Sequence, residues 1–150
     1  MVNRKNILAL LALGAVFLAA YLILGGGGSD EERIREIVCT ELPDCFEEGD
    51  LGDISDLLTE TFELTRRNET MTRTEMCDVL RYFFLRGRRL SISGRIERLE
   101  FSESGTEASV LWKGEILAKG KGVRRREAGT GELVFQKKSG EWLLDQAVVY

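Results

Sequence analysis

The feature that most constrains this chain is a long apolar run close to its start. Residues 7–24 read ILALLALGAVFLAAYLIL and contain no charged side chain. As an α-helix, a run of this length extends about 27 Å, which is just enough to cross the hydrocarbon core of a bilayer. We therefore predict a stub at residues 1–6 and a transmembrane helix at residues 7–24.

Two other interpretations of this run stay open. A cleaved signal peptide usually has a shorter apolar region, of about 7 to 15 residues, but the small residues 25–28 stand where a peptidase would cut. No cysteine follows directly, which argues against a bacterial lipoprotein anchor. The run could also be a buried helix of the following domain.

The charges on either side of the run predict its orientation. Arg4 and Lys5 precede it, whereas Asp30 and two glutamates follow it. Positive charge is retained on the cytoplasmic side, so we expect a cytoplasmic N-terminus and a domain outside, as in the bacterial inner (cytoplasmic) membrane. The four glycines at residues 25–28 would form a flexible linker.

Charge and composition exclude several classes of function. The whole chain carries −4 and its first 28 residues hold two cations and no acid, so the remainder carries −6. Binding to nucleic acid requires clustered cations, so we expect this acidic domain not to bind nucleic acid. The absence of histidine removes the commonest general base and metal ligand, so neither a metal site nor a cofactor is predicted.

Three cysteines, Cys39, Cys45 and Cys77, lack the paired spacing of a zinc site, and packing is their expected role. On one regular helix Cys39 and Cys45 would point about 120° apart and would not bridge. A disulfide between Cys45 and Cys77 stays open if their helices touch, since an extracytoplasmic domain permits it.

Two helices are predicted after the linker, from apolar residues that recur every three or four positions. Ser29 and Glu32 form a capping-box pattern that begins the first helix. Pro43 lies within that helix and should kink or break it, because proline donates no backbone hydrogen bond. Asp50 should cap a short second helix that buries residues as far as Leu58.

A third helix is predicted from Thr72, which repeats the capping-box pattern with Glu75, to a stop near Gly87. The arginines at its end would interact favourably with the helix dipole. Alternation after residue 90 indicates strands, and a change of phase near Glu97 and Arg98 indicates a β-bulge. The other predicted strands are residues 61–65, 108–118, 123–127, 132–135 and 142–150. Helices segregated from strands predict an α+β domain at residues 29–150, with about three helices packed on a curved, mainly antiparallel sheet.

Two phrases carry a resemblance to a known family. CFEEGDLGDI at residues 45–54 and SGEWLLD at residues 139–145 resemble recurring phrases of the nuclear transport factor 2-like superfamily, which includes SnoaL-like and ketosteroid-isomerase-like domains. The resemblance covers most of residues 29–150. It implies a cone-shaped, cystatin-like fold in which a curved sheet surrounds a pocket and helices close one side. Neither phrase is catalytic, so the resemblance concerns the fold.

The resemblance also implies a range of roles. Some relatives use the pocket for cofactor-free isomerisation or dehydration, some bind partners, and some are inner-membrane scaffolds of secretion systems with one N-terminal anchor. This chain departs from the enzymes that use a pocket histidine, because it has none. An aspartate and tyrosine pair, as in the isomerases, cannot be matched to particular positions.

Three residues are candidates for ligand binding. Tyr82 and Trp112 would line a pocket if one exists, although aromatic residues in a domain of this size usually belong to the core. Arg125 is the middle one of three arginines in a predicted strand, and alternation sends at least one of the three to each face. One arginine would then anchor an anionic ligand, unless the segment is a solvated edge or hairpin.

Two hypotheses about function follow. The first is a non-enzymatic, membrane-tethered binding or assembly module with a protein partner or with self-association. The alternative is a cofactor-free pocket enzyme or small-molecule binder in which an acid of raised pKa works inside an apolar cone. A pocket filled by Trp112 and Phe135 would argue against the alternative, and a cavity with a buried carboxylate beside a tyrosine would argue for it.

Overall fold

The computed structural model describes residues 29–150. No helix within that range is long and apolar enough to span a membrane. The predicted stub, transmembrane helix and linker occupy residues 1–28 and therefore lie outside the described residues. Residues 34–150 form one compact unit, and the following description of packing concerns this unit.

The helical elements come first in the chain, with one more between the early strands and the long ones. They are α2 (Asp30–Glu36), the π-helical turn η1 (Ile37–Glu41), α3 (Leu42–Glu48), α4 (Leu51–Asp56) and α5 (Arg73–Leu85).

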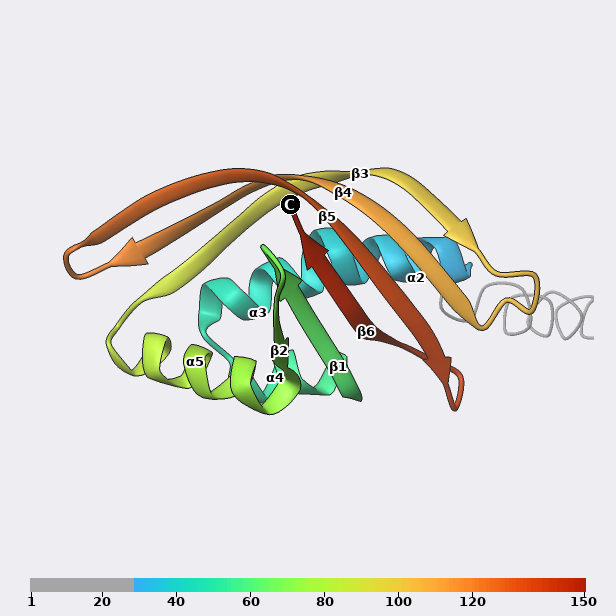
Figure 1. Cartoon of the computed structure of the whole chain (residues 1–150), viewed down its shortest axis with the longest axis horizontal. Helices are drawn as coiled ribbons and strands as arrows, with labels where there is room; N and C mark the ends of the chain where they lie inside the picture. Colours follow the sequence, from blue (N-terminus) through green and yellow to red (C-terminus); the bar gives the residue numbers. More distant parts are fainter. Residues whose placement is uncertain (1–28) are drawn as a thin grey trace, which may run out of the picture. The chain divides into compact units, whose positions relative to one another are not determined.

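The strands form a single six-stranded sheet. They are β1 (Leu58–Arg66), β2 (Glu69–Thr72), β3 (Arg89–Phe101), β4 (Glu107–Gly120), β5 (Val123–Lys138) and β6 (Glu141–Val149), in the order β2-β1-β6-β5-β4-β3. Within the described residues, only the β1–β6 pair is parallel. Strands β3, β4 and β5 arch over α3 and α5 (Figure 1). The predicted α+β class, with helices on one side of a curved, mainly antiparallel sheet, is therefore confirmed for the described residues.

The core lies between the helices and the concave side of the arch. Along β4 the buried residues Ala108 and Val110 alternate with exposed ones, and Phe135 of β5 faces Ala108. Ile34, Ile37 and Val38, from α2 and η1, are also among the buried residues of this cluster. Burial of such side chains is the main driving force for folding.

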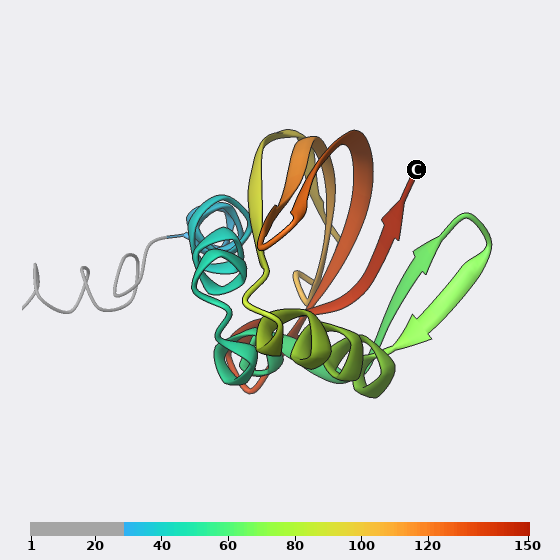
Figure 2. The same cartoon turned by 90° about the vertical axis from the view of Figure 1, so that its left-hand side faces the viewer.

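Three glycines lie in register across the middle of the sheet. Gly94 of β3 faces Gly114 of β4, which faces Gly129 of β5. A Cβ atom on either Gly94 or Gly114 would lie 2.5 Å from the indole ring of Trp112. The glycines therefore leave the space that this ring occupies on the core side. Glycine within a strand also suits the strong bow of these strands, which Figure 2 shows.

The first helix is not broken at Pro43, but its α-helical pattern is interrupted just before the proline, where the sequence predicted a kink or a break. The backbone widens into η1 just before the proline, and the N–H of Leu42 bonds the carbonyl of Ile37, five residues back. Pro43 then falls in the first turn of α3. The π-helical turn shifts the backbone hydrogen bonds just before the proline, so the helix continues although Pro43 donates none.

In the first half of the domain one predicted boundary was wrong and one strand was missed. Leu58 is buried as the first residue of β1 and does not belong to the second helix, which ends at Asp56. The segment after β1 is a hairpin, in which Arg67 and Asn68 adopt positive φ angles of 50° and 68° and β2 follows. Its strand β2 was not predicted.

The two strands predicted at residues 123–127 and 132–135 are one continuous strand, β5. The intervening Gly129, Thr130 and Gly131 pair with β4 without a register shift. In this fold these residues face the strand that carries Trp112. The predicted bulge is confirmed, since the β3–β4 register shifts between Ile96 and Arg98.

Candidate functional site

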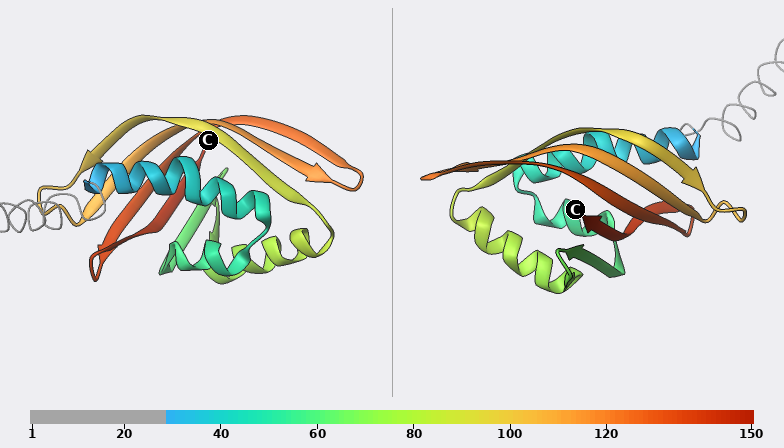
Figure 3. Two further views of the ribbon diagram at one scale, coloured as in Figure 1. Left: turned by 180° about the vertical axis from the view of Figure 1, so that it is seen from behind. Right: turned by 45° about the horizontal axis from the view of Figure 1, so that its top comes forward.

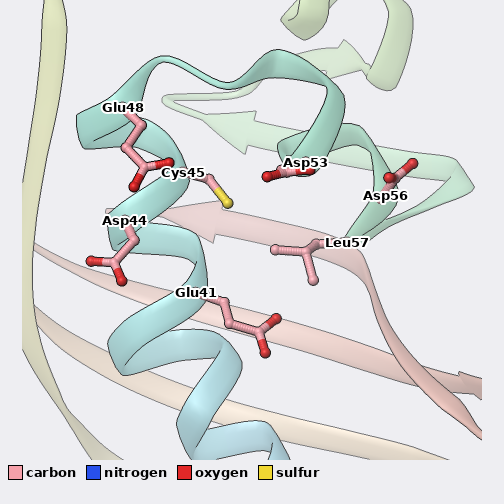
Figure 4. A pocket seen from close by; sticks show the side chains of 7 residues that line it. All are labelled: Glu41, Asp44, Cys45, Glu48, Asp53, Asp56 and Leu57. Atoms are coloured by element: carbon pink, nitrogen blue, oxygen red, sulfur yellow. The ribbon is translucent and has the colours of Figure 1, made fainter.

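A pocket of about 360 Å³ lies between α3 and α4. Five of the side chains that line it are carboxylates, and none is a cation. Figure 4 shows the thiol of Cys45 pointing toward Asp53, whereas the side chain of Asp44 projects from α3 in another direction. The lining residues are Glu41, Asp44, Cys45, Glu48, Asp53, Asp56 and Leu57.

The acids of this pocket come together because of the turn between α3 and α4. Gly49 ends α3 in the left-handed conformation, with φ of 71°, which favours glycine. Asp50 then caps α4 by accepting a 3.0 Å hydrogen bond from the backbone N–H of Asp53. The predicted capping role of Asp50 is therefore confirmed, and it places two carboxylates close together.

The crowding of negative charge changes two ionisation equilibria. The pKa of Asp53 is raised, mainly by the negative charge of Asp50. The pKa of the Cys45 thiol is also raised, first by burial and then by Asp53, Asp50 and further acids. Since the thiolate is the reactive form, Cys45 is a poor nucleophile at neutral pH.

The chemistry of the pocket is therefore that of an acidic surface. It repels anions and attracts cations. Across residues 29–150, no group of three or more Cys, Asp or Glu side chains has the arrangement needed to hold a metal ion. Sequence reasoning did not identify this pocket, although four of its acids lie in the segment from residue 44 to residue 56.

The three predicted ligand-binding residues lie in different surroundings. Trp112 is half-buried, packs against the core cluster and fills the space beside the glycine row. Tyr82 lies on α5 with 58% of its surface exposed, and the guanidinium of Arg86 stacks over its ring at 4.3 Å. Arg125 lies in β5 and forms a 2.8 Å ion pair with Glu127.

A set of ion pairs joins β5 to β1, which β6 separates in the sheet and which sequence reasoning did not connect. Glu127 of β5 bonds Arg125 and also Arg66 of β1, at 2.5 Å. By register, Glu127 and Arg125 occupy the same sheet face as Ile116, Ala118 and the core. The three ion-paired side chains are between 37% and 74% exposed, so these ion pairs add little to stability.

A second polar cluster surrounds Asp145. Its side chain accepts hydrogen bonds from Thr59 at 2.6 Å, Thr61 at 2.9 Å and Gln136 at 3.3 Å. Gln136 follows the buried Phe135 along β5, so alternation places Gln136 on the sheet face away from the core, whereas Asp145 stands at the register shift between β5 and β6 and is itself buried. No sequence signal pointed to this cluster, because its members are distant in the chain.

The cysteines of the described residues are free thiols. Cys45 lines the acidic pocket, whereas Cys77 of α5 lies 3.5 Å from the hydroxyl of Ser55. The disulfide between Cys45 and Cys77 that the sequence left open is therefore not formed in this structure.

Comparison with known proteins identifies the fold. No family model and no curated protein matches the sequence. A conserved protein from Planctomyces limnophilus is 20% identical with a TM-score of 0.71, covering 81% of this chain and 96% of that one. A candidate scytalone dehydratase from Novosphingobium aromaticivorans is 18% identical with a TM-score of 0.70, covering 80% and 82%.

A third solved structure is a candidate calcium/calmodulin-dependent protein kinase II association domain from Xanthomonas campestris. It is 15% identical with a TM-score of 0.62, and the match covers 84% of this chain and 89% of that one. Other structures with this fold are described as nuclear transport factor 2-like or cystatin-like. The described domain thus has the nuclear transport factor 2-like fold, as the sequence resemblance implied. At these identities the likeness shows the fold alone.

Proposed function

We propose that this chain is a membrane-tethered, extracytoplasmic binding or assembly module. The observation that carries the proposal is the position of Asp145, the buried carboxylate of the described domain. Its oxygens are already bonded by Thr59, Thr61 and Gln136. A general acid or base would instead need an oxygen that is free to reach a substrate.

Two further observations support a binding role. The sequence contains no histidine, and the thiol of Cys45 is held in its unreactive form by burial and neighbouring acids. The tether is proposed from the uncharged residues 7–24 and from the cations that precede them. One structural neighbour is named for an association domain, which is compatible with assembly.

Fractionation and crosslinking of the full chain test this proposal. We expect the chain to resist alkaline extraction from membranes, and to be recovered after crosslinking and mild detergent extraction in a complex larger than one copy. Recovery of a soluble product whose first residue lies beyond position 24 would overturn the tether. Recovery of a single uncrosslinked copy from the membrane would overturn the assembly role.

The alternative function is a small-molecule binder or a cofactor-free enzyme of the dehydratase type. It is favoured by the name of one neighbour and by half-buried apolar residues such as Ile92 and Ile116 on the core side of the sheet. Glu127, held between Arg66 and Arg125, is the acid on that face best placed to act. Trp112 fluorescence would report the binding of apolar compounds. Saturable binding that Glu127→Gln weakens would favour this alternative.

A further inference from the structure

The C-terminal half of α5 exposes apolar side chains that the fold does not cover. Val79 is 55% exposed, Tyr82 58% and Leu85 81%, and they follow each other at intervals of three residues. They account for three of the five large hydrophobic residues that are exposed in residues 29–150. The opposite side of the helix buries Met76 and Leu80 in the core. The exposed residues therefore form a separate apolar stripe.

Cations accompany this stripe, although the domain as a whole is acidic. No acidic residue occurs between Asp78 and Glu97, whereas arginines stand at positions 81, 86, 88, 89 and 95. The guanidinium of Arg86 covers the ring of Tyr82. Apolar and aromatic residues interleaved with arginines on one amphipathic helix are typical of a segment that lies in a membrane interface.

The hairpin between β4 and β5 adds further cations beside the end of α5. A Cβ atom on Gly120 would lie 2.8 Å from the carbonyl oxygen of Gly87 and 2.9 Å from Cα of Arg88, so the hairpin touches the turn after the helix. Figure 1 and the left view of Figure 3 show the hairpin and this end of α5 on the same side of the unit. Lys121 lies in the hairpin and Arg124 follows it.

Apart from Arg89, which bonds the backbone oxygens of Phe84 and Arg88, four of these cations have no carboxylate partner among residues 29–150. They are Arg86, Arg88, Lys121 and Arg124, and we call them the basic end. Neighbouring cations are neutralised instead. Lys119 bonds Glu47, and Arg125 bonds Glu127. The surface that remains is positively charged and lies next to the apolar stripe of α5.

We propose that the stripe and the basic end together dock on an anionic lipid surface. Tyr82 and Leu85 would enter the interface, and the basic end would contact the headgroups, each cation adding to binding within a Debye length. A nucleic acid would use the cations but would give the exposed leucine and valine no partner. The acidic pocket on α3 and α4 would be repelled by the same surface, which fixes the orientation of the domain.

The proposal rests on the tether described above, which would hold the domain beside a bilayer. Docking on anionic lipid also explains why an acidic protein would keep an unpaired basic surface. Once residues 7–24 hold the chain at the membrane, docking becomes an intramolecular step that a few cations and side chains can drive.

The test places a photoreactive benzoylphenylalanine at Tyr82 of the full chain, reconstituted in phosphatidylcholine vesicles with or without about a third phosphatidylglycerol. Tyr150, which is 70% exposed, receives the same probe as a matched control. We expect phospholipid adducts at position 82, several times more than at position 150, and mostly in the anionic vesicles. The double variant Arg86→Glu/Lys121→Glu should lower the yield at position 82 roughly tenfold.

Arg95→Glu is the control for charge reversal, because Arg95 pairs with Glu97 outside the basic end. It should leave the yield unchanged. If the double variant fails to fold, the native chain in 0.5 M salt replaces it and should also lose adducts. Equal yields with neutral and anionic lipid, equal yields at positions 82 and 150, or adducts mainly with a second copy of the chain would each overturn docking. Release of the chain by alkaline washing would overturn the tether alone.

Discussion

Thr59 donates a 2.6 Å hydrogen bond to Oδ1 of Asp145, although 86 residues separate the two in the chain. Between the pairs Leu58↔Leu144 and Glu63↔Gln146, β1 contains four residues and β6 contains one. The bond thus fastens the irregular stretch of the only parallel strand pair in the described sheet. Both side chains are buried, so neither has water as an alternative partner.

Thr59→Val should lower the free energy of unfolding by about 1.5–3 kcal/mol, the usual range for a hydrogen bond to a charged group. The substitution keeps the shape of the side chain and removes only the donor. Urea denaturation measures the effect. Thr61→Val is the matched control and should cost less, because Thr61 is exposed and water can replace its hydroxyl. Equal costs at the two positions would contradict this explanation.

Gly94→Ala should destabilise the protein by about 1–3 kcal/mol, because the new methyl group would overlap the ring of Trp112. Combining it with Trp112→Leu should remove this penalty, so that alanine costs almost nothing in the double variant. Gly114→Ala is the comparison, since its Cβ would also lie 2.2 Å from the backbone oxygen of Ser93. Its penalty should persist without the indole ring. Thermal denaturation of the two glycine variants, of Trp112→Leu and of the two combined variants decides whether it does.

Thr72→Ala should cost about 0.5–2 kcal/mol by removing the cap of α5. The capping box that the sequence predicted is complete. The N–H of Glu75 donates to Thr72 Oγ1 at 3.3 Å, and the N–H of Thr72 donates to Glu75 at 2.8 Å. Thr74→Ala, two residues on and exposed, should be neutral or slightly stabilising, because alanine favours a helix. Chemical denaturation curves that rank the two variants the other way would disprove the role of the cap.

Asp53→Asn should stabilise the protein at neutral pH and have no effect in acid. Asp50 raises the pKa of Asp53 in the folded state, so the stability linked to its protonated form is fully present below the unfolded pKa of about 3.9. That stability is lost as the pH rises through the folded-state pKa. The measurement is the melting temperature of both proteins from pH 3 to pH 7.

Glu47→Gln should show the opposite sign. Lys119 lowers the pKa of Glu47, so the contribution of this carboxylate is present above its unfolded pKa of about 4.3 and lost as the pH falls through the folded-state pKa. The variant should therefore be less stable than the native protein near pH 7 and equal to it in strong acid. If the stability of each variant changed with pH just as that of the native protein does, then Asp50 would not set the ionisation of Asp53, nor Lys119 that of Glu47.

Local patterns were sufficient for much of the fold. The cap at Thr72, the cap at Asp50 and the bulge after Ile96 were all predicted, because each depends on residues within one turn or one strand. The wrong boundaries arose where distant residues decide. The glycines of β5 resemble a turn until β4 and Trp112 are placed opposite them.

The candidate sites were less accessible to sequence reasoning. Tyr82, Trp112 and Arg125 were chosen by residue type, and the structure places them in separate surroundings. The acidic pocket depends on how α3 and α4 are turned, and the contact between Gly120 and Gly87 depends on hairpin geometry. Neither follows from periodicity.

The sequence by itself determined the apolar run at residues 7–24, the acidic balance, the lack of histidine and the α+β class, because each depends on composition or on short-range repetition. Only the tertiary structure decided which side chains bond Asp145, where the acids of the pocket gather and which cations stay unpaired at the end of α5. Those properties depend on strand register and helix packing, which join residues that are far apart in the chain.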